Sequence, residues 1–201
     1  MSISLEKGQR ISLEKNGNTL DKVCVGVNWG AIEKKGFFGT KKVAVDLDAS
    51  VSLHGADNKL VDVVYFSQLK SKDGSVQHSG DDLTGDLDGD DGLDNEIITI
   101  QLNKVPAGVE KIAIILNSFQ GQDFASIPFA SVRLYEGTPS RVDSIMASYN
   151  IANEPKFKGS VSMVLGTLYR HNKDWKFRAV GEVTSDKRLE GSIETVIREF
   201  L

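Results

Sequence analysis

Hydrophobic and polar residues alternate with a period of two over most of the chain. Within residues 23–29, three valines and Trp29 alternate with Cys24, Gly26 and Asn28. Such alternation is typical of a strand that buries one face. The same pattern predicts further strands over 43–54, 61–66, 97–102, 111–117, 130–136, 142–149, 161–170 and 174–183.

Helical periodicity is convincing only at the C-terminal end. From Asp186 to Leu201 the apolar residues recur at helical spacing, and Asp186 is placed to cap the helix. Gly, Asn and Asp punctuate the rest, as at 172–174, where a tight turn would join the last two strands. Many short strands at this spacing favour a mostly β sandwich or barrel. No linker divides the chain, so we expect residues 1–201 to form one domain.

The amino-acid composition restricts the class of protein and leaves the predicted fold unchanged. Of 201 residues, 40% are hydrophobic and 26% are charged, which is a globular composition and not a disordered one. The single cysteine, Cys24, excludes an internal disulfide and a cysteine zinc cluster. No apolar run approaches the roughly 18 residues of a membrane span, and the N-terminal segment does not resemble a signal peptide. We therefore expect a cytoplasmic protein.

The negative charge of the chain is concentrated in one segment, residues 80–96, which we call the acidic loop. The formal net charge is −4, but this segment alone carries eight acids and no base. The rest of the chain is therefore +4, and a local cluster of this kind indicates a site. The eight acids are Asp81, Asp82, Asp86, Asp88, Asp90, Asp91, Asp94 and Glu96.

A bound hard cation would explain how the acidic loop folds. Two like charges about 4 Å apart repel by roughly 1 kcal/mol in water and roughly 4 kcal/mol at an effective dielectric of 20. Interleaved glycines let several oxygens converge, and an oxygen-only ligand set favours Ca²⁺ before Mg²⁺ or Mn²⁺. The spacing is not that of an EF-hand, because Asp91 stands where glycine is required and Ile97 where glutamate is required. The alternative is a solvated acidic loop without a ligand.

Two aspartates and the histidines outside the acidic loop also inform the prediction of a metal site. Asp46 and Asp48 lie two apart on a predicted strand, so both project from one face and could form a further wall of the site. Histidines 54, 78 and 171 are spread singly, which argues against zinc. His78 abuts the acidic loop and is placed for a hydrogen bond behind it.

Four stretches that span nearly the whole chain carry a family resemblance: residues 5–13, 45–50, 78–91 and 166–181. They resemble the TerD-like tellurium-resistance and stress-response proteins. The resemblance implies an antiparallel β-sandwich of two sheets that binds calcium, commonly two ions, through the acidic loop and the Asp-Leu-Asp strand. It also implies a cytoplasmic location and a role in tellurite, phage or general stress tolerance, with no established enzymatic chemistry.

The resemblance also implies a set of calcium ligands. Residues 92–95 depart from the family pattern because they separate Asp91 from Glu96, which leaves open whether Glu96 or Asp94 reaches an ion. Backbone carbonyls near Ser79 and Thr84 are expected to contribute oxygens. The implied side-chain ligands are Asp46, Asp48, Asp81, Asp82, Asp86, Asp88, Asp90, Asp91 and Glu96.

Two functional hypotheses follow. The first is a calcium-binding interaction module, not an enzyme, whose partners are other stress-response or tellurium-resistance proteins at the inner membrane surface. The lysine-rich segment 33–42, with Phe37 and Phe38 at its centre, suits a partner or anionic membrane contact, or packs over the edge of the fold. We expect no nucleic acid, and no small-molecule substrate is identified. The second hypothesis is an Mg²⁺- or Mn²⁺-dependent hydrolase or phosphoryl-transfer enzyme that uses the same carboxylates, but the sequence offers no independent general base.

Overall fold

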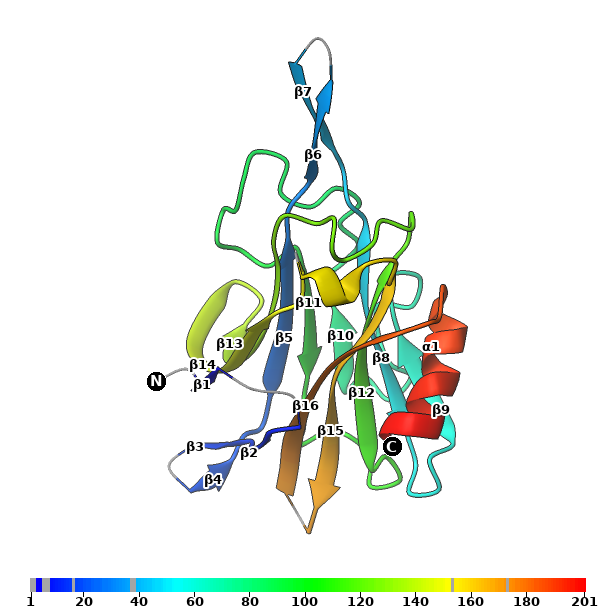
Figure 1. Cartoon of the computed structure of the whole chain (residues 1–201). Coiled ribbons are helices and arrows are strands. Elements are labelled where there is room, and N and C mark those ends of the chain that lie inside the picture. The colour runs from blue at the N-terminus through cyan, green and yellow to red at the C-terminus, as the bar shows by residue number, and fades with distance from the viewer. Residues whose placement is uncertain (1–2, 5–7, 16, 37–38, 153, 173) are drawn as a thin grey trace.

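Two six-stranded sheets make up the body of the molecule (Figure 1). The structure is a computed structural model that describes all residues except 1–2, 5–7, 16, 37–38, 153 and 173. In spatial order, sheet A contains β1 (Ile3–Ser4), β14 (Arg141–Asn150), β13 (Ala130–Thr138), β5 (Val23–Trp29), β11 (Glu96–Ile100) and β10 (Val76–His78). Sheet B contains β2 (Arg10–Ser12), β16 (Asp174–Thr184), β15 (Ser162–His171), β12 (Lys111–Ser118), β8 (Leu47–His54) and β9 (Leu60–Val64).

The hydrophobic core lies between the two sheets. From sheet A it takes the valines of β5 and Trp29, and from sheet B it takes Leu47, Val51 and Leu53 of β8 together with alternate residues of β12. Burying an aliphatic or aromatic side chain of this size contributes about 1.5–3 kcal/mol. The faces that alternation assigned to the core are therefore confirmed, and so is the mostly β sandwich.

The opposite faces of β5 and β8 are buried too, so the prediction of a single buried face is wrong for these two strands. Every residue of both strands is buried. Behind β5, Cys24 packs with Ile97 and Tyr135 in a second apolar cluster, and burial raises the pKa of the Cys24 thiol. On the outer side of sheet B, residues of the C-terminal helix pack on β12 and β15. Segments distant in sequence therefore cover faces that look solvent-facing in the strand pattern.

The C-terminal helix, α1 (Leu189–Thr195), continues into a π-helical turn, Val196–Phe200. Its N-cap residue is Arg188, so the predicted capping role of Asp186 is wrong. A short 3₁₀ turn spans Pro155–Phe157. Among the residues that the structure describes, no helix is long and apolar enough to cross a membrane.

One further prediction needs correction, and two features of the sheets were not predicted. The strand expected over 43–54 is split, because the chain leaves one strand at Val43 and enters β8 only at Leu47. The short strand β10, which has only three residues, was not predicted. The described strands pair in the expected antiparallel way, except that β1 runs parallel to β14.

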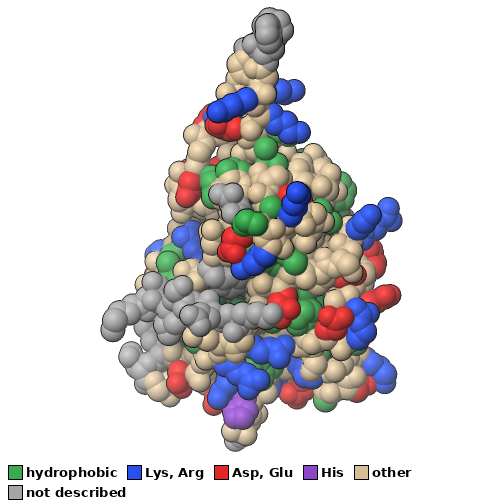
Figure 2. All heavy atoms as spheres, in the orientation of Figure 1, with side chains coloured by type: hydrophobic (Ala, Val, Ile, Leu, Met, Phe, Trp, Pro, Cys, Tyr) green, Lys and Arg blue, Asp and Glu red, His purple; other side chains and the backbone are tan. Residues whose placement is uncertain are grey.

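Two small hairpins stand outside the sheets. One pairs β3 (Glu14–Lys15) with β4 (Asn18–Thr19), and the other pairs β6 (Ile32–Gly36) with β7 (Gly39–Val43). The β6–β7 hairpin projects from the body as an arm flanked by basic side chains (Figures 1 and 2). Lys34 lies directly opposite Lys41, a like-charge pair that destabilises an isolated hairpin. The predicted contact residues Phe37 and Phe38 lie outside the described residues.

Buried His54 makes the stability of sheet B sensitive to acid. Its Nδ1 lies 3.1 Å from the Asn58 carbonyl oxygen and its Nε2 lies 2.8 Å from the Ser52 hydroxyl, so the neutral ring donates to the first and accepts from the second. Burial lowers the pKa of His54 below its ordinary value of 6.5, and nearby Lys111 acts in the same direction. The stabilising contribution of neutral His54 is thus complete above about pH 6.5 and is lost as the pH falls through the pKa that His54 has in the folded protein.

On acidification from pH 7.5 to 5.5 we expect His54 to lower the free energy of unfolding in urea, whereas buried acids with a raised pKa, such as Asp48, act in the opposite direction. The variant His54→Gln retains a donor and an acceptor but does not titrate, so the change in the free energy of unfolding between the two pH values should be more favourable in the variant than in the parent protein. An identical pH dependence in the variant and the parent protein would contradict this assignment.

Candidate metal centre

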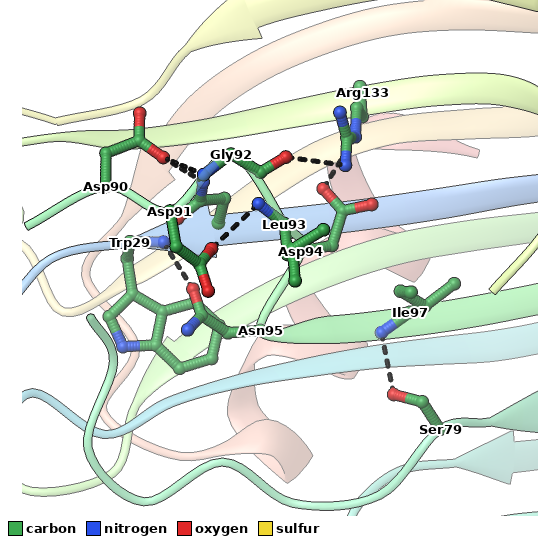
Figure 3. A network of polar contacts seen from close by, with 11 residues as sticks. Trp29, Ser79, Asp90, Asp91, Gly92, Leu93, Asp94, Asn95, Ile97 and Arg133 are labelled. Atoms are coloured by element: carbon green, nitrogen blue, oxygen red, sulfur yellow. Dashed lines mark hydrogen bonds and ion pairs between the residues drawn. The ribbon is translucent and has the colours of Figure 1, made fainter. Parts of the chain in front are cut away.

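The acidic loop is anchored on Trp29 at the end of β5. The Asp86 amide donates to the Trp29 carbonyl oxygen at 3.0 Å, and the Trp29 amide donates to Asn95 Oδ1 at 2.8 Å (Figure 3). Gly85 has φ +63°, and a Cβ at this position would lie 2.5 Å from the Trp29 indole. Only glycine allows the loop to pass this close to the ring, so the backbone path is set before any ligand is considered.

Three aspartates meet beside the start of β8 and form what we call the first cluster: Asp46, Asp48 and Asp81. Their nearest carboxylate oxygens lie within 4.8 Å of one another. Asp46 immediately precedes β8 and Asp48 lies within it, and both are buried, at 3% and 6% exposed, whereas Asp81 is exposed. The structure thus brings the two strand aspartates to one acid of the loop.

The electrostatics of the first cluster are unfavourable without a cation. Burial, followed by the charges of Glu96 and Asp46, raises the pKa of Asp48 to about 7. Burial, followed by the charge of Asp81, raises the pKa of Asp46. One oxygen of Asp46, Oδ1, is buried and has no hydrogen-bond partner among the residues that the structure describes. A buried carboxylate oxygen of this kind is costly unless a positive charge compensates it.

The second cluster consists of Asp86, Asp90 and Asp91, whose nearest carboxylate oxygens again lie within 4.8 Å of one another. It is more exposed than the first, and the loop backbone supports it: the Asp91 amide donates to Asp86 Oδ2 at 3.2 Å. Asn28 Nδ2 donates to Asp90 Oδ1 at 2.9 Å, and Asn28 Oδ1 is buried without a partner among the described residues. Asn28 therefore contacts this cluster through its amide nitrogen.

Asp82 and Asp88 lie outside both clusters. Asp82 Oδ1 accepts from the amides of Thr84 and Gly85 at 2.9 and 3.0 Å. Burial by itself would raise the pKa of Asp82, but these hydrogen bonds outweigh it and lower the pKa. Asp88 is fully exposed and pairs with Lys42 at 3.0 Å, which ties the loop to the β6–β7 arm. Asp82 thus shapes the loop, and Asp88 belongs to neither cluster.

Glu96 is fully buried behind the first cluster. Its Oε2 accepts from the Ala49 amide at 2.7 Å and lies 3.3 Å from His78 Nε2, which also lies 3.0 Å from the Ala49 carbonyl oxygen. Burial raises the pKa of Glu96. Burial alone would lower the pKa of His78, but Glu96 outweighs it and raises that pKa. The expected hydrogen bond of His78 behind the loop is therefore present.

Asp94 faces away from both clusters. Its side chain is 2% exposed, and its Oδ1 forms an ion pair with Arg133 Nε at 2.7 Å (Figure 3). The carboxylate lies over Gly26, where an added Cβ would come within 1.9 Å of Asp94 Oδ2. Of the two alternatives left open for the extended loop, the structure therefore places Glu96 next to the first cluster and Asp94 elsewhere.

Comparison with known proteins settles the family. The family model described as the TerD domain matches residues 1–195. This chain belongs to the TerD family.

The relatives of this TerD-family chain match it over almost their whole length. Stress response protein SCP2 of Bacillus subtilis (strain 168) is 38% identical and covers 98% of this chain and 100% of its own. Tellurium resistance protein TerZ of Serratia marcescens is 34% identical, over 94% and 93% of the two chains. The solved structure of a telluride resistance protein (TerD) homologue from Streptomyces coelicolor A3(2) superposes with a TM-score of 0.66 at 17% identity, over 86% and 95% of the two chains, and supports the fold alone.

The TerD assignment confirms the family resemblance and leaves the ligand set a prediction. Of the nine predicted ligands, six form the two clusters, whereas Asp82, Asp88 and Glu96 stand outside them. The sequence analysis did not identify Asn28 as part of the site. Its side chain lies on the strand face that was predicted to face solvent, so nothing in the strand pattern indicated that the acidic loop folds over it.

Proposed function

We propose that this TerD-family protein binds two calcium ions, one at each carboxylate cluster, and that the loaded loop forms a surface for a partner in a stress response. The observation that carries the proposal is Asp46 Oδ1, a buried carboxylate oxygen without a hydrogen-bond partner beside two other aspartates. A divalent cation would offset the repulsion within the cluster and the desolvation of Asp46 and Asp48.

Calcium suits this ligand set better than other ions. Both clusters offer carboxylate oxygens. Calcium takes six to eight oxygens in flexible geometry, whereas magnesium demands a tight octahedron and keeps several waters. His78 is engaged with Ala49 and Glu96, so it is not available as the nitrogen ligand that zinc favours.

The physiological role is proposed from the relatives. Their names refer to tellurium resistance and stress response, and we propose the same class of role for this chain, in the cytoplasm and with partner proteins at the inner membrane surface. The Lys42–Asp88 ion pair joins the acidic loop to the basic arm, so ordering of the loop by calcium would also restrain the arm. We propose a binding module and not an enzyme.

Isothermal titration of chelator-stripped protein tests this function. We expect two calcium ions per chain that magnesium does not displace. Asp48→Asn should remove one ion and the double variant Asp86→Ala/Asp90→Ala the other, because each disrupts one cluster. Absence of binding heat would contradict the proposal, and so would two retained ions in either variant. Turnover of a phosphate ester with Mn²⁺, lost in the same variants, would favour the hydrolase alternative instead.

A further inference from the structure

A cavity of about 800 Å³ lies on the outer side of sheet B, between helix α1 and strands β8 and β9. Helix α1 runs beside these strands in Figure 1. We call this cavity the helix cavity. Its volume falls within the range of roughly 300–1,000 Å³ that is typical of small-molecule sites.

Aromatic and aliphatic side chains form the walls of the helix cavity. Tyr65 and Phe66 meet edge to face at 5.3 Å between ring centroids, and Phe66 meets Phe119 in the same way at 5.7 Å. Ile193 and Ile197 of the helix segment line the cavity from the other side. Phe119 is 66% exposed, so a large aromatic surface is left facing solvent, as occurs at binding sites.

The floor of the helix cavity is polar and buried. Asp48 of β8 and Asn117 of β12 are direct cross-strand partners, so their side chains lie side by side on one face. Asn117 Nδ2 donates to the hydroxyls of Ser162 and Ser192 at 3.0 and 3.1 Å, which fixes the amide. Asn117 Oδ1 is left buried without a partner among the described residues. The floor therefore contains the Asp48 carboxylate and one amide oxygen that lacks a donor.

The charge preference of the helix cavity comes from this floor. Its rim carries two bases, Lys187 and Arg188, and two acids, Glu190 and Glu194, which balance. A carboxylate below aromatic walls is an environment that favours an ammonium group, through ion pairing and through cation–π attraction. We propose that the helix cavity binds a small amphipathic amine, with its aromatic or alkyl body against Phe119 and Ile197 and its ammonium group toward Asp48 and Asn117.

The test uses 2-phenylethylamine as the probe and 3-phenylpropionate as an anion of similar size. Both are titrated in chelator, because calcium at the first cluster would compete with the amine for Asp48. We expect saturable shifts of backbone amide signals from β8, β12 and α1 with the amine, at a dissociation constant on the order of 1 mM for so small a ligand. The anion should bind at least several-fold more weakly. Absence of saturable shifts would overturn the proposal, and so would equal affinity for the anion.

Two variants locate the site. Phe119→Ala removes an exposed wall and should weaken amine binding about threefold to tenfold, the usual effect of losing one aromatic contact. Leu93→Ala is the matched control, because Leu93 is also 66% exposed but lies on the acidic loop, outside the residues that line the cavity. It should leave the affinity unchanged. Unaltered affinity in Phe119→Ala, or equal loss in both variants, would overturn the assignment.

Discussion

Calcium bound at the first cluster is expected to raise the melting temperature of the chelator-stripped protein by about 5–10 °C, and Asp46→Asn is expected to abolish this contribution. At a calcium concentration one hundred times Kd, binding contributes about 2.7 kcal/mol. In a domain of this size, each kcal/mol shifts the melting temperature by about 2–4 °C. Asp46 carries the effect because its Oδ1 is buried without a partner beside Asp48 and Asp81.

The same variant should change the metal-free protein in the opposite direction. Burial and the neighbouring charge of Asp81 disfavour ionised Asp46. Asp46→Asn removes that repulsion, so the stripped variant should melt above the stripped parent protein. Asp88→Asn is the control, because Asp88 is fully exposed and outside both clusters, and it should keep the full calcium shift. A full shift in Asp46→Asn would exclude the first cluster as a calcium site.

Arg133→Met is expected to lower the stability by about 3–5 kcal/mol, because it leaves Asp94 buried without a counter-charge. The Arg133 Nε–Asp94 Oδ1 pair is 2.7 Å long and Asp94 is only 2% exposed. Thermal or urea unfolding measures the loss. The double variant Arg133→Met/Asp94→Asn should recover much of it, because no unpaired charge is then buried. The deficit of the single variant should also shrink at acidic pH, where protonated Asp94 is neutral.

An exposed pair of equal length provides the control for this prediction. Arg141 Nε and Asp143 Oδ1 are also 2.7 Å apart, but their side chains are 70% and 36% exposed. Arg141→Met should therefore change the melting temperature little, since solvent screens such pairs. Similar losses in Arg133→Met and Arg141→Met would show that burial does not govern the Asp94 pair.

The sequence was most informative where the pattern is local. Alternation placed β5 at residues 23–29, the bounds that the structure has, because period-two patterning depends only on neighbours in the chain. It could not reveal that Asn28 is covered by the acidic loop, since that contact joins residues 62 apart. A strand pattern identifies the face that enters the core and does not show what lies on the other face.

The same difference between local patterns and contacts of distant residues holds for the candidate site. A dense run of acids and glycines indicated a cation site, and the structure gathers six of the nine predicted ligands into clusters. Its division into two clusters depends on how Trp29 holds the loop, and the outward position of Asp88 depends on Lys42. These are contacts between distant segments that composition and spacing do not encode.

The pair of His78 and Glu96 has a consequence for the solubility of the fold. Strand β9 ends at Val64, opposite Val51, so β8 continues beyond its neighbour on that side. An open strand edge is a template onto which another chain can add and aggregate. Here the amide of Ala49 bonds to Glu96 and its carbonyl oxygen lies against His78, so both backbone groups are occupied by side chains. The two residues that lie behind the first cluster therefore also keep sheet B from gaining a foreign strand at this edge.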